Sequence, residues 1–165
     1  IAKSVGVSIG TIYNYFPTLD DLFLEVFLES SVDIARLIEK TARENEASKV
    51  LKSLCRTYVA YLNENMTFFQ MMSHFILSNH PSKNKGTVKM NQIMRTMMDR
   101  LEEAVIMAGV RTDTRITAHA LFAALNGIML SYARYPGRSA DEIRAHTLRL
   151  ADLIARSFTG QHEVV

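Results

Sequence analysis

The chain has 165 residues, 48% of them hydrophobic and 22% charged, which is the composition of a folded protein with one domain or one domain and a small module. Its apolar runs are too short to span a bilayer, and its only cysteine, Cys55, excludes an intrachain disulfide, so we expect a cytoplasmic protein with no membrane partner. The net charge of +2 is too mild to indicate nucleic acid binding by itself.

Residues 1–16 have the pattern of two helices joined by a tight turn. The apolar residues before Gly6 fit the last turns of an amphipathic helix that this glycine ends. Ser8 can then cap a second helix with its side-chain oxygen. Ile12 and Phe16 are one helical turn apart and form its inner face, so a polar and aromatic face remains. Such a helix-turn-helix pair places its second helix in the major groove of DNA.

Residues 1–22 closely resemble the DNA-binding signature of the tetracycline-repressor family of bacterial transcription regulators. The shared features are the turn glycine, the Gly10-Thr11 pair, a Tyr-x-Tyr-Phe run and an acidic-leucine start of the next helix. The resemblance implies a recognition helix over residues 8–15, with DNA contacts from Lys3, Ser8, Ile9, Gly10, Thr11, Tyr13, Asn14 and Tyr15. Leu19 departs from the signature, because members commonly carry there a lysine that meets the DNA backbone.

The resemblance also implies an architecture. We expect an all-α chain with a helix-turn-helix module over residues 1–28 and a larger helical domain for effector binding and dimerisation over residues 29–165. Family members have a further helix before the one that Gly6 ends, and the sequence begins without it and without a starting methionine. We therefore expect an N-terminally incomplete copy of the protein. The plain alternative for this segment is a helical hairpin that only packs.

Helical periodicity continues to the end of the chain. Thr18 and Asp21 have the spacing of a capping box at the start of a long helix, and Ser139 and Glu142 repeat it before the last one. The pattern predicts helices over residues 18–43, 47–63, 67–78, 88–108, 114–134 (or from Asp113) and 139–158, with a polar loop over 79–86. No run alternates as a strand would, which predicts the all-α class.

Methionines are concentrated in two successive predicted helices, beside several phenylalanines. Because methionine is flexible and polarisable, such a cluster can line a cavity for an apolar ligand; plain core packing is the alternative, and the two are evenly balanced. Polar groups beside the apolar faces could orient a ligand, and they are Tyr58, His74, His119 and Asn126. We predict a cavity for a small hydrophobic effector bounded by Tyr58, Leu62, Phe69, Met72, Met94, Met98, Leu121, Phe122 and Asn126.

The last two predicted helices carry more apolar surface than one partner helix could cover. The resemblance implies that they pair with the same helices of a second copy in a four-helix bundle. We predict a homodimer interface that includes Leu125, Met129, Ile143, Leu150, Ala151, Ile154 and Phe158. Packing within one subunit is the alternative.

No pattern indicates catalysis. Cys55 lies on an apolar helix face without a nearby base, and the histidines lack metal-ligand spacing. We predict no catalytic residue, no metal and no cofactor. The features together predict a DNA-binding transcription regulator, a repressor that binds a palindromic double-stranded operator as a homodimer and leaves it when a small, largely apolar ligand binds. The alternative is a helical small-molecule carrier or dimerisation module without sequence-specific DNA binding.

Overall fold

The computed structural model describes residues 6–77 and 85–159, so Lys3 and most of the predicted loop over 79–86 lie outside the described residues. Within those residues the chain forms α-helices and no strand, which confirms the all-α class. The helices are α1 Ile9–Tyr15, α2 Leu19–Glu44, α3 Val50–Glu64, α4 Met66–Leu77, α5 Lys85–Met107, α6 Thr114–Tyr132 and α7 Ala140–Thr159.

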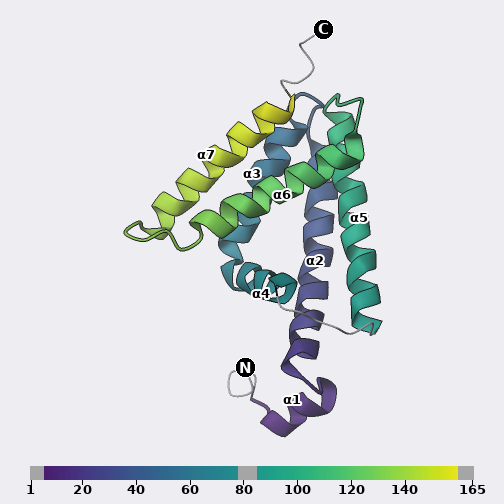
Figure 1. Ribbon diagram of the computed structural model, residues 1–165, viewed down its shortest axis with the longest axis vertical. Coiled ribbons are helices and arrows are strands. Elements are labelled where there is room, and N and C mark those ends of the chain that lie inside the picture. Colours follow the sequence, from purple (N-terminus) through teal and green to yellow (C-terminus); the bar gives the residue numbers. More distant parts are fainter. Residues whose placement is uncertain (1–5, 78–84, 160–165) are drawn as a thin grey trace.

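The long helix α2 joins the two ends of the molecule (Figure 1). α1 projects from its first turn, and packs closely against none of the other described helices. α3 and α5 pack against α2, α4 lies across the lower part of the body, and α6 and α7 form an antiparallel pair that covers α3 and α5. The arrangement places a small projecting head at one end and a packed helical body at the other.

Local sequence signals set the helix starts. The Ser8 side-chain oxygen accepts the Thr11 N–H at 3.0 Å and caps α1. At α2, the Thr18 hydroxyl accepts the Asp21 N–H and the Asp21 carboxylate accepts the Thr18 N–H, both at 3.1 Å. Ser139 forms the same reciprocal pair at the start of α7, accepting from Glu142 at 3.3 Å and donating to it at 2.8 Å. These caps confirm the predicted helix starts.

Two helix starts differ from the prediction by three residues each, and the other boundaries agree within two residues. α3 begins at Val50 and not at residue 47, because a turn closed by the Lys49 N–H to the Glu46 carbonyl, 2.8 Å, precedes it. α5 begins at Lys85, so Gly86 lies inside its first turn and does not end the loop. In the described part of the chain, no helix is both long and apolar enough to cross a membrane.

One hydrophobic core holds the body together. α3 lies at its centre and buries a full stripe of side chains: Val50, Leu51, Leu54, Cys55, Tyr58, Val59 and Leu62. The other helices of the body each add one face to the same cluster. Burial of apolar side chains is worth about 1.5–3 kcal/mol each, so this shared core is the main stabilising term of the fold.

Candidate DNA-binding head and effector core

The predicted recognition helix, α1, is exposed along its whole length. None of its residues is buried, and Ile9, Tyr13 and Tyr15 expose 67%, 50% and 77% of their surface. Only Ile12, on the expected inner face, and Phe16, just after the helix, are half-buried. A short helix that presents large apolar and aromatic side chains to solvent is suited to contact a partner.

The head, which we define as residues 6–18, is held by its ends. Gly6 has φ +70, in the left-handed region where glycine is free of strain, and so allows the turn before α1. The Ser8 and Thr11 hydroxyls lie 2.8 Å apart and share a hydrogen bond in the first turn. The Thr18–Asp21 capping box then fixes the start of α2. The structure therefore brings Ser8, Ile9, Gly10, Thr11, Tyr13, Asn14 and Tyr15 together on one exposed turn and helix.

The segment that contains the head is acidic in sequence, and two of its carboxylates pair with cations from outside it, Glu25 with Lys89 at 3.6 Å and Asp33 with Arg36 at 3.4 Å. Residues 6–35 contain no Lys or Arg, and their acidic residues are Asp20, Asp21, Glu25, Glu29 and Asp33. Leu19, at the position where the related signature commonly has lysine, is 54% exposed and supplies no charge. Hydroxyl groups, the Asn14 amide and backbone N–H groups are consequently the described donors for phosphate in this region.

The predicted effector-cavity residues do converge in the body. Tyr58, Leu62, Phe69, Met72, Met98 and Leu121 are buried in the common core, and Met94 and Phe122 pack against it half-buried. They come from α3, α4, α5 and α6, which are separated in the sequence. Convergence fits a ligand-lined cavity and a solid core equally well, so the cavity stays a prediction.

A polar pair lies inside this apolar group. The Tyr58 hydroxyl donates to the Asn126 side-chain oxygen at 3.2 Å, and the Asn126 amide donates to the Phe122 carbonyl at 2.8 Å. The Tyr58 and Phe122 rings are tilted with centroids 6.1 Å apart. Burial raises the pKa of Tyr58 well above its usual range, and the hydrogen bond to Asn126 offsets only part of this effect. The phenol therefore stays protonated as a donor.

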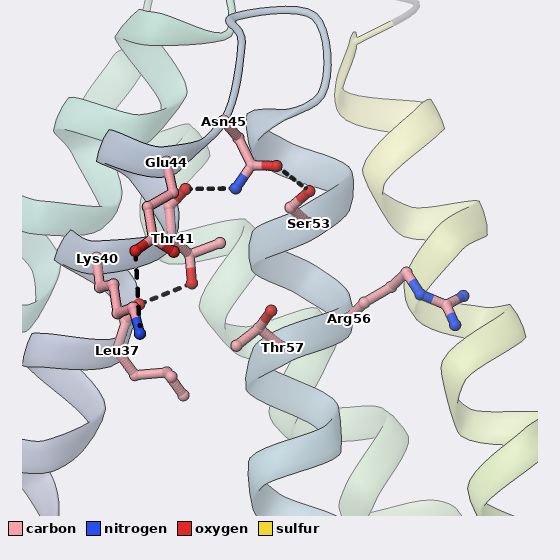
Figure 2. Close-up of a pocket in the computed structure, with 8 residues that line it drawn as sticks. All are labelled: Leu37, Lys40, Thr41, Glu44, Asn45, Ser53, Arg56 and Thr57. Atoms are coloured by element: carbon pink, nitrogen blue, oxygen red, sulfur yellow. Dashed lines mark hydrogen bonds and ion pairs between the residues drawn. The ribbon is translucent and has the colours of Figure 1, made fainter.

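A groove of about 410 Å³ lies elsewhere, between the end of α2 and the start of α3 (Figure 2). It is lined by Leu37, Lys40, Thr41, Glu44, Asn45, Ser53, Arg56 and Thr57. Ser53 donates to the Asn45 side-chain oxygen at 2.7 Å, and the Asn45 amide donates to the Thr41 carbonyl at 2.7 Å. Arg56 points toward α7, where it pairs with Asp152 at 2.7 Å (Figure 2). The groove's polar side chains thus largely satisfy one another, and sequence reasoning did not single them out.

The outer face of α6 and α7 corrects part of the predicted dimer interface. Leu125, Met129 and Ala151 are 1%, 0% and 0% exposed within one chain, so they have no surface to offer a second copy and their assignment to an interface is wrong. They point inward because α6 and α7 pack on α3 through these residues. Ile143, Leu150, Ile154 and Phe158 are half-buried and remain available in part.

Other side chains of this pair are the exposed ones. Ile116, Leu130 and Leu153 expose 68%, 59% and 52% of their surface. On α6, Ile116 and Leu130 lie at the two ends of a row of small residues, Ala120, Ala123 and Gly127, and a Cβ added at Gly127 would meet nothing within 4 Å. We define the α6–α7 face as Ile116, Ala120, Ala123, Gly127, Leu130, Leu150, Leu153 and Ile154. It is apolar and small enough in its middle for another helix to approach closely.

Cys55 has the character of a core thiol. It is fully buried, and burial, with a smaller contribution from the nearby charge of Asp152, raises its pKa to about 12. A nucleophilic cysteine needs a lowered pKa and access to solvent. Among the described residues there is no cluster of His, Cys, Asp and Glu that could hold a metal ion.

Comparison with known proteins agrees with this geometry. Residues 1–26 match the family of bacterial regulatory proteins described as the tetR family. The TetR-family transcriptional regulator PfmR from Thermus thermophilus is 22% identical with a TM-score of 0.70, over 94% of this chain and 85% of that chain.

Two regulators from Bacillus have the same fold. FadR from Bacillus subtilis, solved in complex with stearoyl-CoA, is 17% identical with a TM-score of 0.72, over 93% of this chain and 84% of that chain. The fatty acid degradation regulator FadR from Bacillus halodurans is 19% identical with a TM-score of 0.74, over 99% and 84%. The N-terminal segment of this chain is thus similar to the tetR family of bacterial regulatory proteins, and its helices have the fold of these solved regulators.

Proposed function

We propose that the chain is a DNA-binding transcription repressor that acts as a homodimer and leaves its operator when a small, largely apolar ligand binds. The observation that carries the proposal is the projecting helix α1, which packs closely against no other described helix and exposes much of Ile9, Tyr13 and Tyr15 (Figure 1). A helix that stands away from its protein in this way can enter a major groove.

We place the boundary between the helix-turn-helix module, residues 1–28, and the helical domain, residues 29–165, inside α2. α2 is continuous from Leu19 to Glu44, so any tilt of this helix against the body also moves α1. A helix of 26 residues is about 39 Å long, and a tilt of about 5° displaces its far end by about 3 Å. Small movements in the body are therefore enlarged at the head.

An aromatic contact joins α2 to α4, the helix that carries two of the predicted effector-cavity residues. Phe27 of α2 stacks on Phe68 of α4 with ring centroids 6.2 Å apart, and Phe68 meets the edge of Tyr61 of α3 at 6.5 Å. Phe69 and Met72, on the same helix as Phe68, belong to the predicted cavity. A ligand that displaces α4 would push directly on α2 through Phe27.

The α6–α7 face supports the homodimer. Its exposed apolar residues, Ile116, Leu130 and Leu153, would be desolvated by the same face of a second copy. Two heads held by such a dimer can read the two halves of a palindromic operator when they are about 34–36 Å apart or a multiple of that distance. A ligand then releases the operator to the extent that it binds the displaced arrangement better than the DNA-bound one.

The core favours an apolar ligand group. None of the nine predicted cavity residues carries a formal charge, and Tyr58 with Asn126 can supply one polar anchor. Bacillus subtilis FadR was solved with stearoyl-CoA, which contains a long acyl chain. A long acyl chain is therefore a reasonable first ligand for this chain as well, with any charged part held outside the core.

The alternative, a helical carrier without sequence-specific DNA binding, draws support from the acidic surroundings of the head. An electrophoretic shift of the protein's own promoter fragment separates the two. The regulator predicts a specific complex that competitor DNA does not remove and that stearoyl-CoA or a free fatty acid weakens. Binding of the apolar ligand with no shift on any promoter fragment would favour the carrier.

A further inference from the structure

The head has an unusual set of side chains for reading base pairs. From residue 6 to residue 35 the chain has no Lys, Arg, His or Gln, and Asn14 is the only side-chain amide. Guanine is most often read by Arg or Lys, which donate two hydrogen bonds to its O6 and N7 atoms. The described head has no Arg or Lys side chain to make this contact.

What the head offers instead is apolar. Ile9 is 67% exposed and Tyr13 is 50% exposed, and they lie one turn apart, so they form one ridge along α1. Between them Gly10 has no side chain, and the nearest atom to a Cβ placed there would be the Ser8 hydroxyl at 3.6 Å. The helix backbone can consequently come close to the base edges beside this ridge.

In the major groove the one apolar group on a base pair is the thymine methyl. We infer that α1 selects A·T pairs, with Ile9 as the specificity-determining residue in contact with a thymine methyl and Tyr13 extending the contact. Asn14 can add paired hydrogen bonds to an adenine. The inference rests on the proposed function and names the DNA class for the same helix: an operator half-site whose base pairs under α1 are A·T.

The acidic residues near the head make these contacts more important. The first turns of α2 carry Asp20, Asp21 and Glu25 and no cation, and Glu25 already pairs with Lys89 at 3.6 Å, so charge neutralisation by the described head adds little affinity. Apolar contacts do not depend on salt. Contacts with the bases then contribute a larger share of the binding free energy than they do for a head rich in lysine and arginine, in which phosphate contacts dominate.

The test begins with the full-length protein and a pool of duplexes that contain a random central segment. Duplexes retained by the protein are sequenced, and each thymine of the selected site is then replaced in turn by deoxyuridine, which removes only the methyl group. Loss of one methyl contact should lower affinity about fourfold at one or two positions per half-site. Ile9→Ala should remove this sensitivity at the position that Ile9 contacts.

Two variants serve as controls. Ile9→Val keeps a branched side chain and should keep most of the sensitivity to deoxyuridine. Val7→Ala removes an apolar side chain that is 41% exposed but lies before α1, and should leave the sensitivity unchanged. Because Ile9 is exposed, these changes should leave thermal unfolding within about 1 °C of the parent.

The outcomes separate the two proposals. A selected site with G·C pairs at the positions protected by α1, or a site unaffected by deoxyuridine, would overturn the A·T inference and leave the regulator standing. If no sequence is enriched at all, the regulator proposal fails and the inference fails with it. Enrichment of A·T pairs with the Ile9-dependent methyl effect supports both.

Discussion

Tyr58 on α3 donates a hydrogen bond to Asn126 on α6 across 3.2 Å, within an otherwise apolar group. Tyr58 is 2% exposed, so neither water nor another helix can easily replace its partner. The pair fixes α3 against α6 at the level of the predicted effector core. A ligand with a carbonyl or hydroxyl group would compete for the same donor.

Removing either side of this pair should cost stability. Tyr58→Phe should lower the free energy of unfolding by about 1 kcal/mol, and Asn126→Ala by about 1–3 kcal/mol because it leaves a buried hydroxyl without an acceptor. Urea unfolding of both variants and of the double variant gives their coupling energy. Tyr61→Phe, the same change on a half-buried tyrosine of α3, is the control and should cost less than about 0.5 kcal/mol. A coupling energy of zero would mean that the bond does not form in solution.

The buried thiol of Cys55 should make stability depend on alkaline pH. Its pKa is raised from 9.0 to about 12 in the folded chain, so the folded state holds the proton while the unfolded state loses it. This contribution is fully present below pH 9, and between pH 9 and 12 it falls by about 1.4 kcal/mol per pH unit. The difference between the parent and Cys55→Ala, measured by urea unfolding from pH 8 to pH 10, should show this slope. An identical pH dependence in both proteins would contradict a protonated, buried thiol.

The starts of α1, α2 and α7 and the position of the head could be predicted because their signals are local. Ser8, Thr18 and Ser139 precede their helices with side chains that cap the nearest N–H groups, and such short-range geometry depends little on the rest of the fold. The exposed face of α1 follows from the same few residues. The DNA-binding signature also lies in this stretch, apart from Leu19, where members of the similar family commonly carry lysine.

The inner face of α6 could not be predicted in the same way. Leu125 and Leu130 are both leucines on a helix that is apolar nearly all round, yet one is 1% exposed and the other 59%. The choice between them is made by α3 and α5, which pack on one side of α6. Periodicity cannot resolve a face when both faces are apolar. The groove beside Asn45 and Ser53 likewise arises from the corner between α2 and α3, which no local pattern describes.

Tyr13 should be needed for specific DNA binding and not for folding. It is 50% exposed on α1, so Tyr13→Ala removes a groove contact and little packing. We expect the specific complex to be lost in an electrophoretic shift while the thermal unfolding curve and the dimer mass stay those of the parent. Tyr135→Ala, on a tyrosine 48% exposed in the turn before α7, is the matched control and should bind DNA normally. Unchanged operator binding by Tyr13→Ala would rule out α1 as the reading helix.

A lysine introduced at position 19, at the start of α2, should strengthen binding to DNA of any sequence. Leu19 is 54% exposed at the first residue of α2, where Leu19→Lys can place an ammonium group against phosphate. Each added phosphate contact steepens the dependence of log K on log salt by about 0.9, or about 1.8 for a dimer. Affinity should rise for operator and unrelated DNA alike, as measured by fluorescence anisotropy over a salt series. Leu19→Gln, which adds no charge, should leave the slope unchanged; equal slopes for the two variants would place Leu19 away from the DNA backbone.

The homodimer should depend on the exposed side of α6 and not on its buried side. Leu130→Glu places a carboxylate at a residue that is 59% exposed in one chain and desolvated in the proposed dimer, so it should yield a folded monomer by light scattering. Ala151→Glu should unfold the chain instead, since Ala151 is fully buried inside the subunit. Val88→Glu makes the same type of change at a residue of α5 that is 66% exposed, and should remain a dimer. The Leu130→Glu monomer should also lose most of its operator affinity, because its two heads no longer bind as one unit. A Leu130→Glu protein that stays a dimer at micromolar concentration would show that pairing uses another surface.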